Sequence, residues 1–269
     1  MKRETGRLER PGCSIHYEVT GEGPALLFAH GLGGNHMSWW QQVGHFSPRF
    51  RCVTFSHRGF WPSSAIPGGP DPDDYAGDLA ALVDHLGIES FVLIAQSMGG
   101  WTAVEYAQLR TGKLRGIVMA ATGGSIARDK LGDPAALAAW EAASAATKQA
   151  LAAAGGHQAT GLRMLAEQPA MALLYQHVDE ANAGLAKEAL RARMNGMRRR
   201  PPEDLAAAGC PILLIANEED VVMPPFASAA IARVVPGASA AMIGKAGHSA
   251  YFERPAEFNA LVEGFLAGL

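Results

Sequence analysis

The sequence predicts an α/β protein in which helices cover both faces of a mostly parallel central sheet. Short apolar runs typical of buried strands alternate with amphipathic runs typical of helices along most of the chain. The chain has 269 residues, of which 48% are hydrophobic, so it can bury one large core. We therefore expect a single α/β unit with no internal repeat.

The strands are recognised as apolar runs bounded by turn residues. They are expected at residues 14–19, 25–29, 51–55, 91–94, 114–121, 211–215 and 239–243. Residues 73–86 place their apolar side chains on one helical stripe that ends at Gly87, a residue suited to a left-handed helix cap. A terminal helix is expected from Pro255 onward.

The alternation of strands and helices breaks between about residues 123 and 202. Asp133 followed by Pro134 is typical of a helix start, and a second helical run is interrupted at Pro169. A third run is expected over residues 179–200. We therefore expect residues 1–123 and 203–269 to form the core and residues 124–202 to form a separate helical segment.

A serine lies at the corner where the apolar run 91–94 gives way to an amphipathic stretch, in the sequence Ala95-Gln-Ser97-Met-Gly-Gly100. Small residues on both sides allow the backbone to double back and lift the serine hydroxyl out of the sheet. Such a turn is also compatible with simple packing. A catalytic interpretation therefore requires partners for Ser97.

Both partners follow in suitable places. A serine hydroxyl becomes nucleophilic when an imidazole accepts its proton, and the imidazole needs an acid to fix its tautomer. His248 lies in a small-residue loop after residues 239–243, and Asp220 lies just beyond the run 211–215. The sequence predicts Ser97, Asp220 and His248 as the catalytic residues, with Glu219 as the alternative acid.

These motifs together resemble the α/β-hydrolase superfamily over nearly the whole chain. The serine turn resembles G-x-S-x-G with Ala95 in place of the first glycine, and the turn His30-Gly-Leu-Gly-Gly34 resembles the family's H-G-x-G. The resemblance implies an oxyanion hole made by the backbone N–H groups of Leu32 and Met98, with His30 in a structural role. It also implies that residues 124–202 are a helical cap inserted between the sixth and seventh strands.

Several apolar side chains are expected near the substrate. Apolar residues at helical spacing usually pack the cap itself, but they can also line an acyl pocket. The segment 55–64 carries Trp61 where the family often has a glycine, so this loop is expected to take a different path. The candidate pocket residues are Trp39, Trp61, Trp140, Met164 and Met171.

The implied function is hydrolysis of a carboxylic ester or lactone of a small, largely apolar substrate through an acyl-enzyme. Among small capped members the chain looks similar to the enol-lactonase and carboxylesterase branch. Carbon-carbon bond hydrolases of the meta-cleavage-product type, cofactor-free haloperoxidases or perhydrolases, and ligand-binding receptors with little turnover remain alternatives, because the core motifs are shared. No metal or organic cofactor is implied.

Composition argues against other classes of function. A net charge of −3 and a pI near 6.3 give no reason to expect nucleic acid or an anionic membrane as a partner. No apolar run is long enough to span a bilayer, so a cytoplasmic protein is expected. The three cysteines, Cys13, Cys52 and Cys210, are far apart and lack metal-ligand spacing. The sequence does not predict an oligomeric state.

Overall fold

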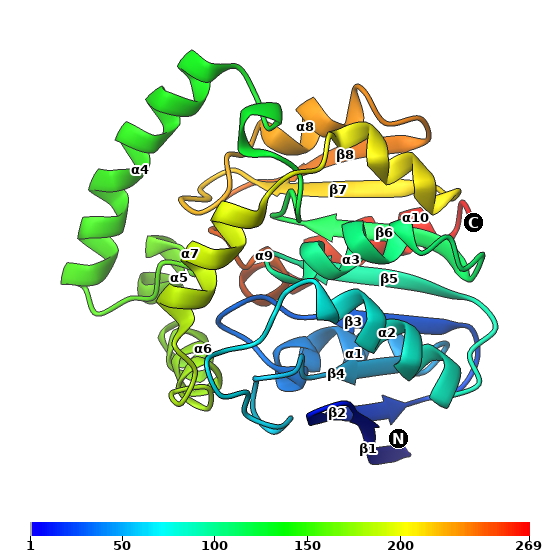
Figure 1. The fold of residues 1–269 in the computed structure, drawn as a ribbon. Coiled ribbons are helices and arrows are strands. Elements are labelled where there is room, and N and C mark those ends of the chain that lie inside the picture. Colours follow the sequence, from blue (N-terminus) through cyan, green and yellow to red (C-terminus); the bar gives the residue numbers. More distant parts are fainter. Residues whose placement is uncertain (1) are drawn as a thin grey trace.

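A computed structural model describes residues 2–269 and is built on one eight-stranded sheet (Figure 1). The strand order is β1-β2-β4-β3-β5-β6-β7-β8. Strands β1 and β2 run antiparallel to their neighbours, and the pairs from β4 to β8 are parallel. The strands are β1 (Arg3–Arg10), β2 (Cys13–Thr20), β3 (Ala25–Ala29), β4 (Arg51–Phe55), β5 (Phe91–Gln96), β6 (Leu114–Ala120), β7 (Ile212–Asn217) and β8 (Ala238–Ile243).

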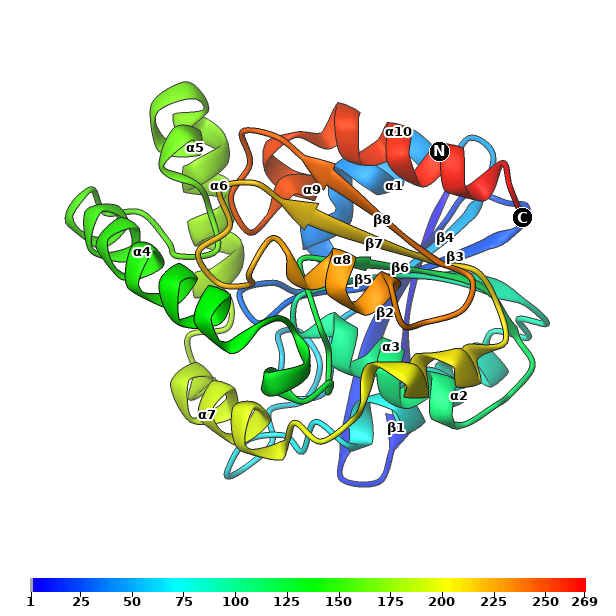
Figure 2. The ribbon, with the colours of Figure 1, turned by 90° about the horizontal axis from the view of Figure 1, so that it is seen from above.

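Helices cover both faces of the sheet, as Figure 2 shows from above. Helices α2 (Asp74–His85), α3 (Gly99–Gln108) and α8 (Ala227–Ala232) pack apolar side chains such as Leu79 and Ile231 on one face. Helices α1 (Trp40–Phe46), α9 (Ala250–Glu253) and α10 (Pro255–Leu266) pack Phe46 and Phe258 on the other. The α/β prediction, with a mostly parallel sheet covered on both faces, is confirmed.

The middle strands β3, β5 and β7 are almost entirely apolar because both of their faces are buried. All residues of β3, β5 and β7 are buried, which explains why these strands were recognisable as continuous apolar runs. Strand β1 was not predicted, because its sequence RETGRLER is mostly exposed and carries no apolar run. It is held at the sheet edge by antiparallel pairing with β2.

Four α-helices leave the core between β6 and β7 and lie beyond the carboxyl ends of the strands (Figure 1). They are α4 (Pro134–Ala153), α5 (Leu162–Glu167), α6 (Pro169–Glu180) and α7 (Lys187–Met197). Asp133 caps α4 by accepting hydrogen bonds from the N–H groups of Ala135 and Ala136. The expected third run was wrong in extent: residues 179 and 180 complete α6, and α7 begins only at Lys187.

The inserted segment begins and ends at one point of the core. Ile126 and Arg200 form a parallel β-bridge, and Ser125 O accepts the N–H groups of Arg199 and Arg200. The Arg200 guanidinium donates to both carboxylate oxygens of Glu105 on α3, at 3.1 and 2.8 Å, and the Ser125 hydroxyl donates to Glu105 at 2.7 Å. Glu105 thereby fastens both ends of the insertion to the core.

No helix within residues 2–269 is both long and apolar enough to cross a membrane.

Replacing Glu105 with Gln is expected to lower the free energy of unfolding by about 2 kcal/mol at pH 7. Burial alone would raise the pKa of Glu105, but hydrogen bonds from Arg200 and Ser125 outweigh burial and hold the pKa below its ordinary value. The stabilisation is therefore present above the ordinary carboxyl pKa and is lost as the pH falls through the lowered one. Urea unfolding from pH 3 to pH 7 measures this.

The exposed Glu203→Gln provides the matched control and should leave the free energy of unfolding nearly unchanged. An equal stability of Glu105→Gln and the unmodified protein at pH 7 would contradict the proposed fastening.

Candidate active site

Loops at the carboxyl ends of four parallel strands meet at one place under the inserted helices. Leu32 follows β3, Ser97 follows β5, Asp220 follows β7 and His248 follows β8. In open α/β sheets this edge is where ligands bind, because the loops on either side of the central strands diverge there. The fold therefore brings together groups that lie far apart along the chain.

Ser97 occupies a sharp turn between β5 and α3. Its φ of 50° lies in the left-handed region, which is uncommon for a residue with a side chain. The turn fits because its neighbours are small: a Cβ on Gly99 would lie 2.2 Å from Ala29 O, and one on Gly100 would lie 2.2 Å from Thr122 Oγ1. Ala95 is fully buried inside β5, where its methyl group is accommodated.

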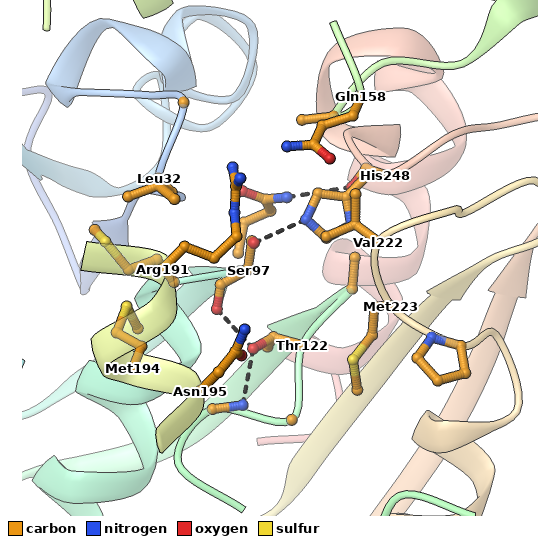
Figure 3. A pocket seen from close by; sticks show the side chains of 18 of the residues that line it. Leu32, Ser97, Thr122, Gln158, Arg191, Met194, Asn195, Val222, Met223 and His248 are labelled. Atoms are coloured by element: carbon orange, nitrogen blue, oxygen red, sulfur yellow. Dashed lines mark hydrogen bonds between the residues drawn. The ribbon is translucent and has the colours of Figure 1, made fainter. Parts of the chain in front are cut away.

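The side chains of Ser97, His248 and Asp220 form one hydrogen-bonded line (Figure 3 shows its serine end). His248 Nδ1 donates to Asp220 Oδ2 at 2.8 Å, because a carboxylate can only accept. This leaves His248 Nε2 as the acceptor for the Ser97 hydroxyl, also at 2.8 Å. The second oxygen of Asp220 accepts the N–H groups of Val222 and Met223, at 2.7 and 2.9 Å, which fixes the carboxylate plane.

The neighbouring acid Glu219 points elsewhere. Its carboxylate accepts from Arg163 Nε and Nη2 at 3.2 and 2.7 Å, and both side chains are partly exposed. The geometry thus favours Asp220 over Glu219 as the partner of His248.

Buried polar side chains hold the His248 loop in place. Gln96 Nε2 and Asn217 Nδ2 both donate to the backbone oxygen of His248, at 3.2 and 3.1 Å. Glu253 accepts the N–H groups of Gly247 and Gly161, at 2.9 and 3.2 Å, and so ties this loop to the inserted segment. Burial raises the pKa of Glu253 against the opposing effect of these N–H groups. Sequence reasoning missed these residues, since no local motif marks them.

The turn that carries Leu32 is held by two buried histidines. The Thr102 hydroxyl donates to His57 Nε2 at 2.8 Å, His57 Nδ1 donates to His30 Nε2 at 3.0 Å, and His30 Nδ1 donates to Gly31 O at 2.8 Å. Burial lowers the pKa of His30 to about 3 and that of His57 well below its ordinary value, so both rings are neutral. No local motif marks His57 as a member of this network.

A cavity of about 400 Å³ opens above Ser97 and is lined by the core loops and the inserted helices (Figure 3). Leu32, Met98 and His248 line it together with Ser97. Within residues 2–269, the backbone N–H groups of Leu32 and Met98 have no hydrogen-bond acceptor. Besides apolar side chains, the lining carries the charged residues Arg128, Glu141, Lys148, Arg191 and Arg198.

Of the five side chains proposed for the pocket, only Trp140 lines this cavity. Its indole N–H also donates to the backbone oxygen of Asp220 at 3.1 Å. Trp39 and Met164 are fully buried in the hydrophobic cluster that also holds Phe252 of α9 and Phe258 of α10, and Met171 packs against the same cluster. Trp61 is 47% exposed, and its ring centre lies 5.9 Å from that of His36. Three of the five side chains, Trp39, Met164 and Met171, therefore pack in a hydrophobic cluster rather than in the cavity.

A comparison with protein-family models matches residues 24–255 to the α/β-hydrolase fold family. The chain belongs to this family. The first two strands precede the matched range, and the match spans the Ser97, Asp220 and His248 loops.

The curated proteins and the solved structures that are similar to this α/β hydrolase include lactone and ester hydrolases. It is 35% identical to 3-oxoadipate enol-lactonase 2 of Acinetobacter baylyi over 100 residues, 35% of this chain and 37% of that protein. An N-acyl homoserine lactone degrading enzyme superposes with a TM-score of 0.77 at 25% identity, over 97% of this chain and 100% of that one. A thermophilic esterase from Thermogutta terrifontis superposes with a TM-score of 0.75 at 25% identity, over 100% and 99%.

Proposed function

We propose that this α/β hydrolase cleaves a carboxylic ester or lactone through an acyl-enzyme formed on Ser97. The observation that carries the proposal is the hydrogen-bonded line from Asp220 through His248 to Ser97, which opens into a cavity. The lactonase and esterase relatives support the same reaction class. The substrate is a small molecule, in keeping with a cavity of about 400 Å³.

In the first half of the proposed reaction, Ser97 Oγ attacks the carbonyl carbon of the substrate while His248 Nε2 accepts the serine proton. Asp220 stabilises the imidazolium that forms and keeps Nδ1 protonated. The carbonyl oxygen gains negative charge and is bound by the unpaired N–H groups of Leu32 and Met98. Collapse of the tetrahedral intermediate breaks the carbon–oxygen bond, and His248 gives its proton to the leaving oxygen.

In the second half, water attacks the acyl-enzyme. His248 accepts a proton from the water, the same N–H groups bind the oxyanion, and Ser97 leaves with the proton that His248 returns. For a lactone substrate the leaving oxygen stays attached to the acyl chain, so a hydroxy acid is released. The inserted helices α4 to α7 serve as the cap in this proposal, since α4 and α7 contribute Trp140 and Met194 to the cavity above Ser97.

Replacing Ser97 with Ala is expected to abolish hydrolysis of p-nitrophenyl acetate, p-nitrophenyl butyrate and a panel of lactones. The methyl side chain has no oxygen to form the acyl-enzyme. Release of nitrophenolate and pH-stat titration measure the loss, and a fluorophosphonate probe followed by mass spectrometry locates the reactive serine. Labelling of a serine other than Ser97, or unchanged turnover by Ser97→Ala, would refute the assignment.

Replacing Asp220 with Asn is expected to lower kcat by about 1,000-fold or more, because an amide does not hold the His248 tautomer that accepts the serine proton. The matched variant Glu219→Gln alters the adjacent carboxylate, which pairs with Arg163, and should keep kcat within about 3-fold. Steady-state kinetics on p-nitrophenyl butyrate compares them. A larger loss for Glu219→Gln than for Asp220→Asn would make Glu219 the acid.

A further inference from the structure

The helix α7 turns a cationic face toward the cavity. Arg191, Met194, Asn195 and Arg198 recur at three- and four-residue spacing, so they share one side of the helix and its carboxyl end, and all four line the cavity. Figure 3 shows Arg191 reaching over the cavity toward Ser97 from this helix. This face of α7 is therefore part of the surface that meets the substrate.

Arg198 lacks the acidic partners that its two neighbours have. Arg199 pairs with Asp73 at 3.0 Å, and Arg200 pairs with Glu105 at 2.8 Å. Arg198 Nη1 donates only to the backbone oxygens of Gly124 and Ile126, at 2.6 and 3.4 Å, and no carboxylate among residues 2–269 lies within ion-pair distance.

Holding the Arg198 guanidinium at this position costs free energy when no anion is bound. Burial, helped by the neighbouring charge of Arg128, lowers the pKa of Arg198 to about 10. The residue still carries its charge at neutral pH. Taking an unpaired guanidinium out of water is unfavourable unless an anion or several acceptors replace the lost hydration. Arg198 Nη2 has no acceptor among the described residues and remains free to donate.

The other charged residues of the cavity do not neutralise the charge of Arg198. Glu141 is paired with Arg128, and Arg191 is paired with Glu188, whose side chain is 81% exposed and outside the cavity. Lys148 has its ammonium 5.7 Å from the centre of the Trp140 ring and no carboxylate partner in the described chain. The cavity therefore holds an excess of positive charge close to Ser97.

Arg198 is also connected to the reactive turn. Gly124, whose oxygen accepts from Arg198, donates its own N–H to Thr122 Oγ1 at 2.9 Å, and Thr122 donates to Ser97 O at 2.6 Å. The guanidinium is thus held in a fixed place relative to the nucleophile, which suits it to orient a substrate.

We propose that the cavity takes an ester or lactone that bears a carboxylate away from the scissile bond, and that Arg198 and Arg191 bind this carboxylate. The proposal rests on the hydrolase function above and names its substrate class. A guanidinium suits a carboxylate because its planar N–H groups can donate two parallel hydrogen bonds.

The test compares half ethyl esters of succinate, glutarate and adipate with ethyl butanoate, pentanoate and hexanoate, which have the same chain lengths without the charge. The unmodified protein is expected to show a kcat/KM about 10- to 100-fold higher for at least one half ester, the range of one or two charge-assisted hydrogen bonds. Arg198→Gln and Arg191→Gln should each bring the ratio of kcat/KM for the half ester to kcat/KM for the neutral ester close to one.

The matched control is Arg193→Gln, on the same helix but exposed and paired with Asp71 outside the cavity. It should retain the preference. Calorimetry with free glutarate and adipate tests the anion site without turnover, so binding that depends on Arg198 supports the site even if no ester is hydrolysed. Equal kcat/KM values for charged and neutral esters, together with no diacid binding, would overturn the proposal while leaving the hydrolase function intact.

A second and independent cluster of side chains lies on and beside β2, outside the cavity. His16 and Glu18 project from the same face of β2, and His36 projects from the short helix η1 (His36–Trp39). One ligand atom from each of the three lies within 4.8 Å of the others. His36 Nε2 is 3.4 Å and His16 Nε2 is 3.7 Å from Glu18 Oε1.

The hydrogen bonds around His36 fix which ring nitrogen carries a proton. The Ser56 hydroxyl donates to the backbone oxygen of Trp61 at 2.9 Å, so toward His36 Nδ1, 3.0 Å away, it can only accept. Nδ1 is therefore the protonated nitrogen, and Nε2 faces Glu18. An added proton on His36 Nε2 would satisfy Glu18, but it would leave His16 Nε2, which is buried without a partner, still unpaired.

A metal ion satisfies all three groups at once. Zinc bonds to histidine nitrogen and carboxylate oxygen are about 2.0–2.2 Å long, so tetrahedral ligands lie about 3.4 Å apart. The two nitrogen–oxygen distances are close to this value. The hydrogen bond from His36 Nδ1 to the Ser56 hydroxyl is of the kind that commonly orients a metal-bound imidazole through its other ring nitrogen. Arg3 lies 3.4 Å from the same Glu18 oxygen at the exposed side and would have to turn away.

We propose that His16, Glu18 and His36 bind a divalent transition-metal ion, with Zn²⁺ as the expected occupant. The bound ion would link β2 to the helix η1, which follows the Leu32 turn. Calorimetry of the chelator-treated protein with Zn²⁺ should give one bound ion per chain, and Co²⁺ should give the visible absorption of a nitrogen- and oxygen-coordinated ion. Trp61, whose ring centre is 5.9 Å from that of His36, should be quenched by Co²⁺.

His16→Gln and His36→Gln should each abolish the bound ion and the absorption band, and Glu18→Gln serves if either fails to fold. His177→Gln, which removes an exposed histidine on α6, is the matched control and should bind as the unmodified protein does. Absence of binding at micromolar Zn²⁺, or binding that survives both cluster substitutions, would overturn the proposal.

Discussion

The turn at Ser97 is the constraint on which the rest of the site depends. A left-handed backbone at this residue points its hydroxyl away from the sheet, and the turn closes only because Gly99 and Gly100 leave room for Ala29 and Thr122. His248 must then reach the hydroxyl from the loop after β8. Buried amides from Gln96 and Asn217 hold the backbone of that loop at the required place.

The sheet and the residues of the hydrogen-bonded line, Ser97, His248 and Asp220, could be predicted because their sequence signals are local. Buried parallel strands are continuous apolar runs, and a small-residue turn after such a run marks Ser97. Asp220 and His248 follow strand ends, and the structure brings both to Ser97, although their catalytic roles remain a proposal. The edge strand β1 escaped prediction, since pairing with β2 rather than burial of its own side chains holds it.

The cavity could not be predicted from residue types alone. Trp39 and Met164 are large and apolar, but whether such a side chain fills the core or faces a ligand depends on how helices pack. Arg198 and Arg200 are two residues apart and chemically identical. Glu105 neutralises Arg200, whereas Arg198 donates to backbone oxygens and to the Asn195 amide and meets no carboxylate among the described residues. That difference comes from the direction of the chain after α7, which no sequence pattern specifies.

The single bridge between Ile126 and Arg200 has a consequence for how this protein can change over evolutionary time. For the core, the long helical insertion is equivalent to a short loop, because the chain leaves the core and returns to it at neighbouring points. Closure entropy grows only slowly with loop length, so helices can be lengthened, shortened or exchanged there at little cost to the sheet. New substrate preferences can thus arise by exchange of these helices, as long as the contacts of Gly161 with Glu253 and of Trp140 with Asp220 are kept.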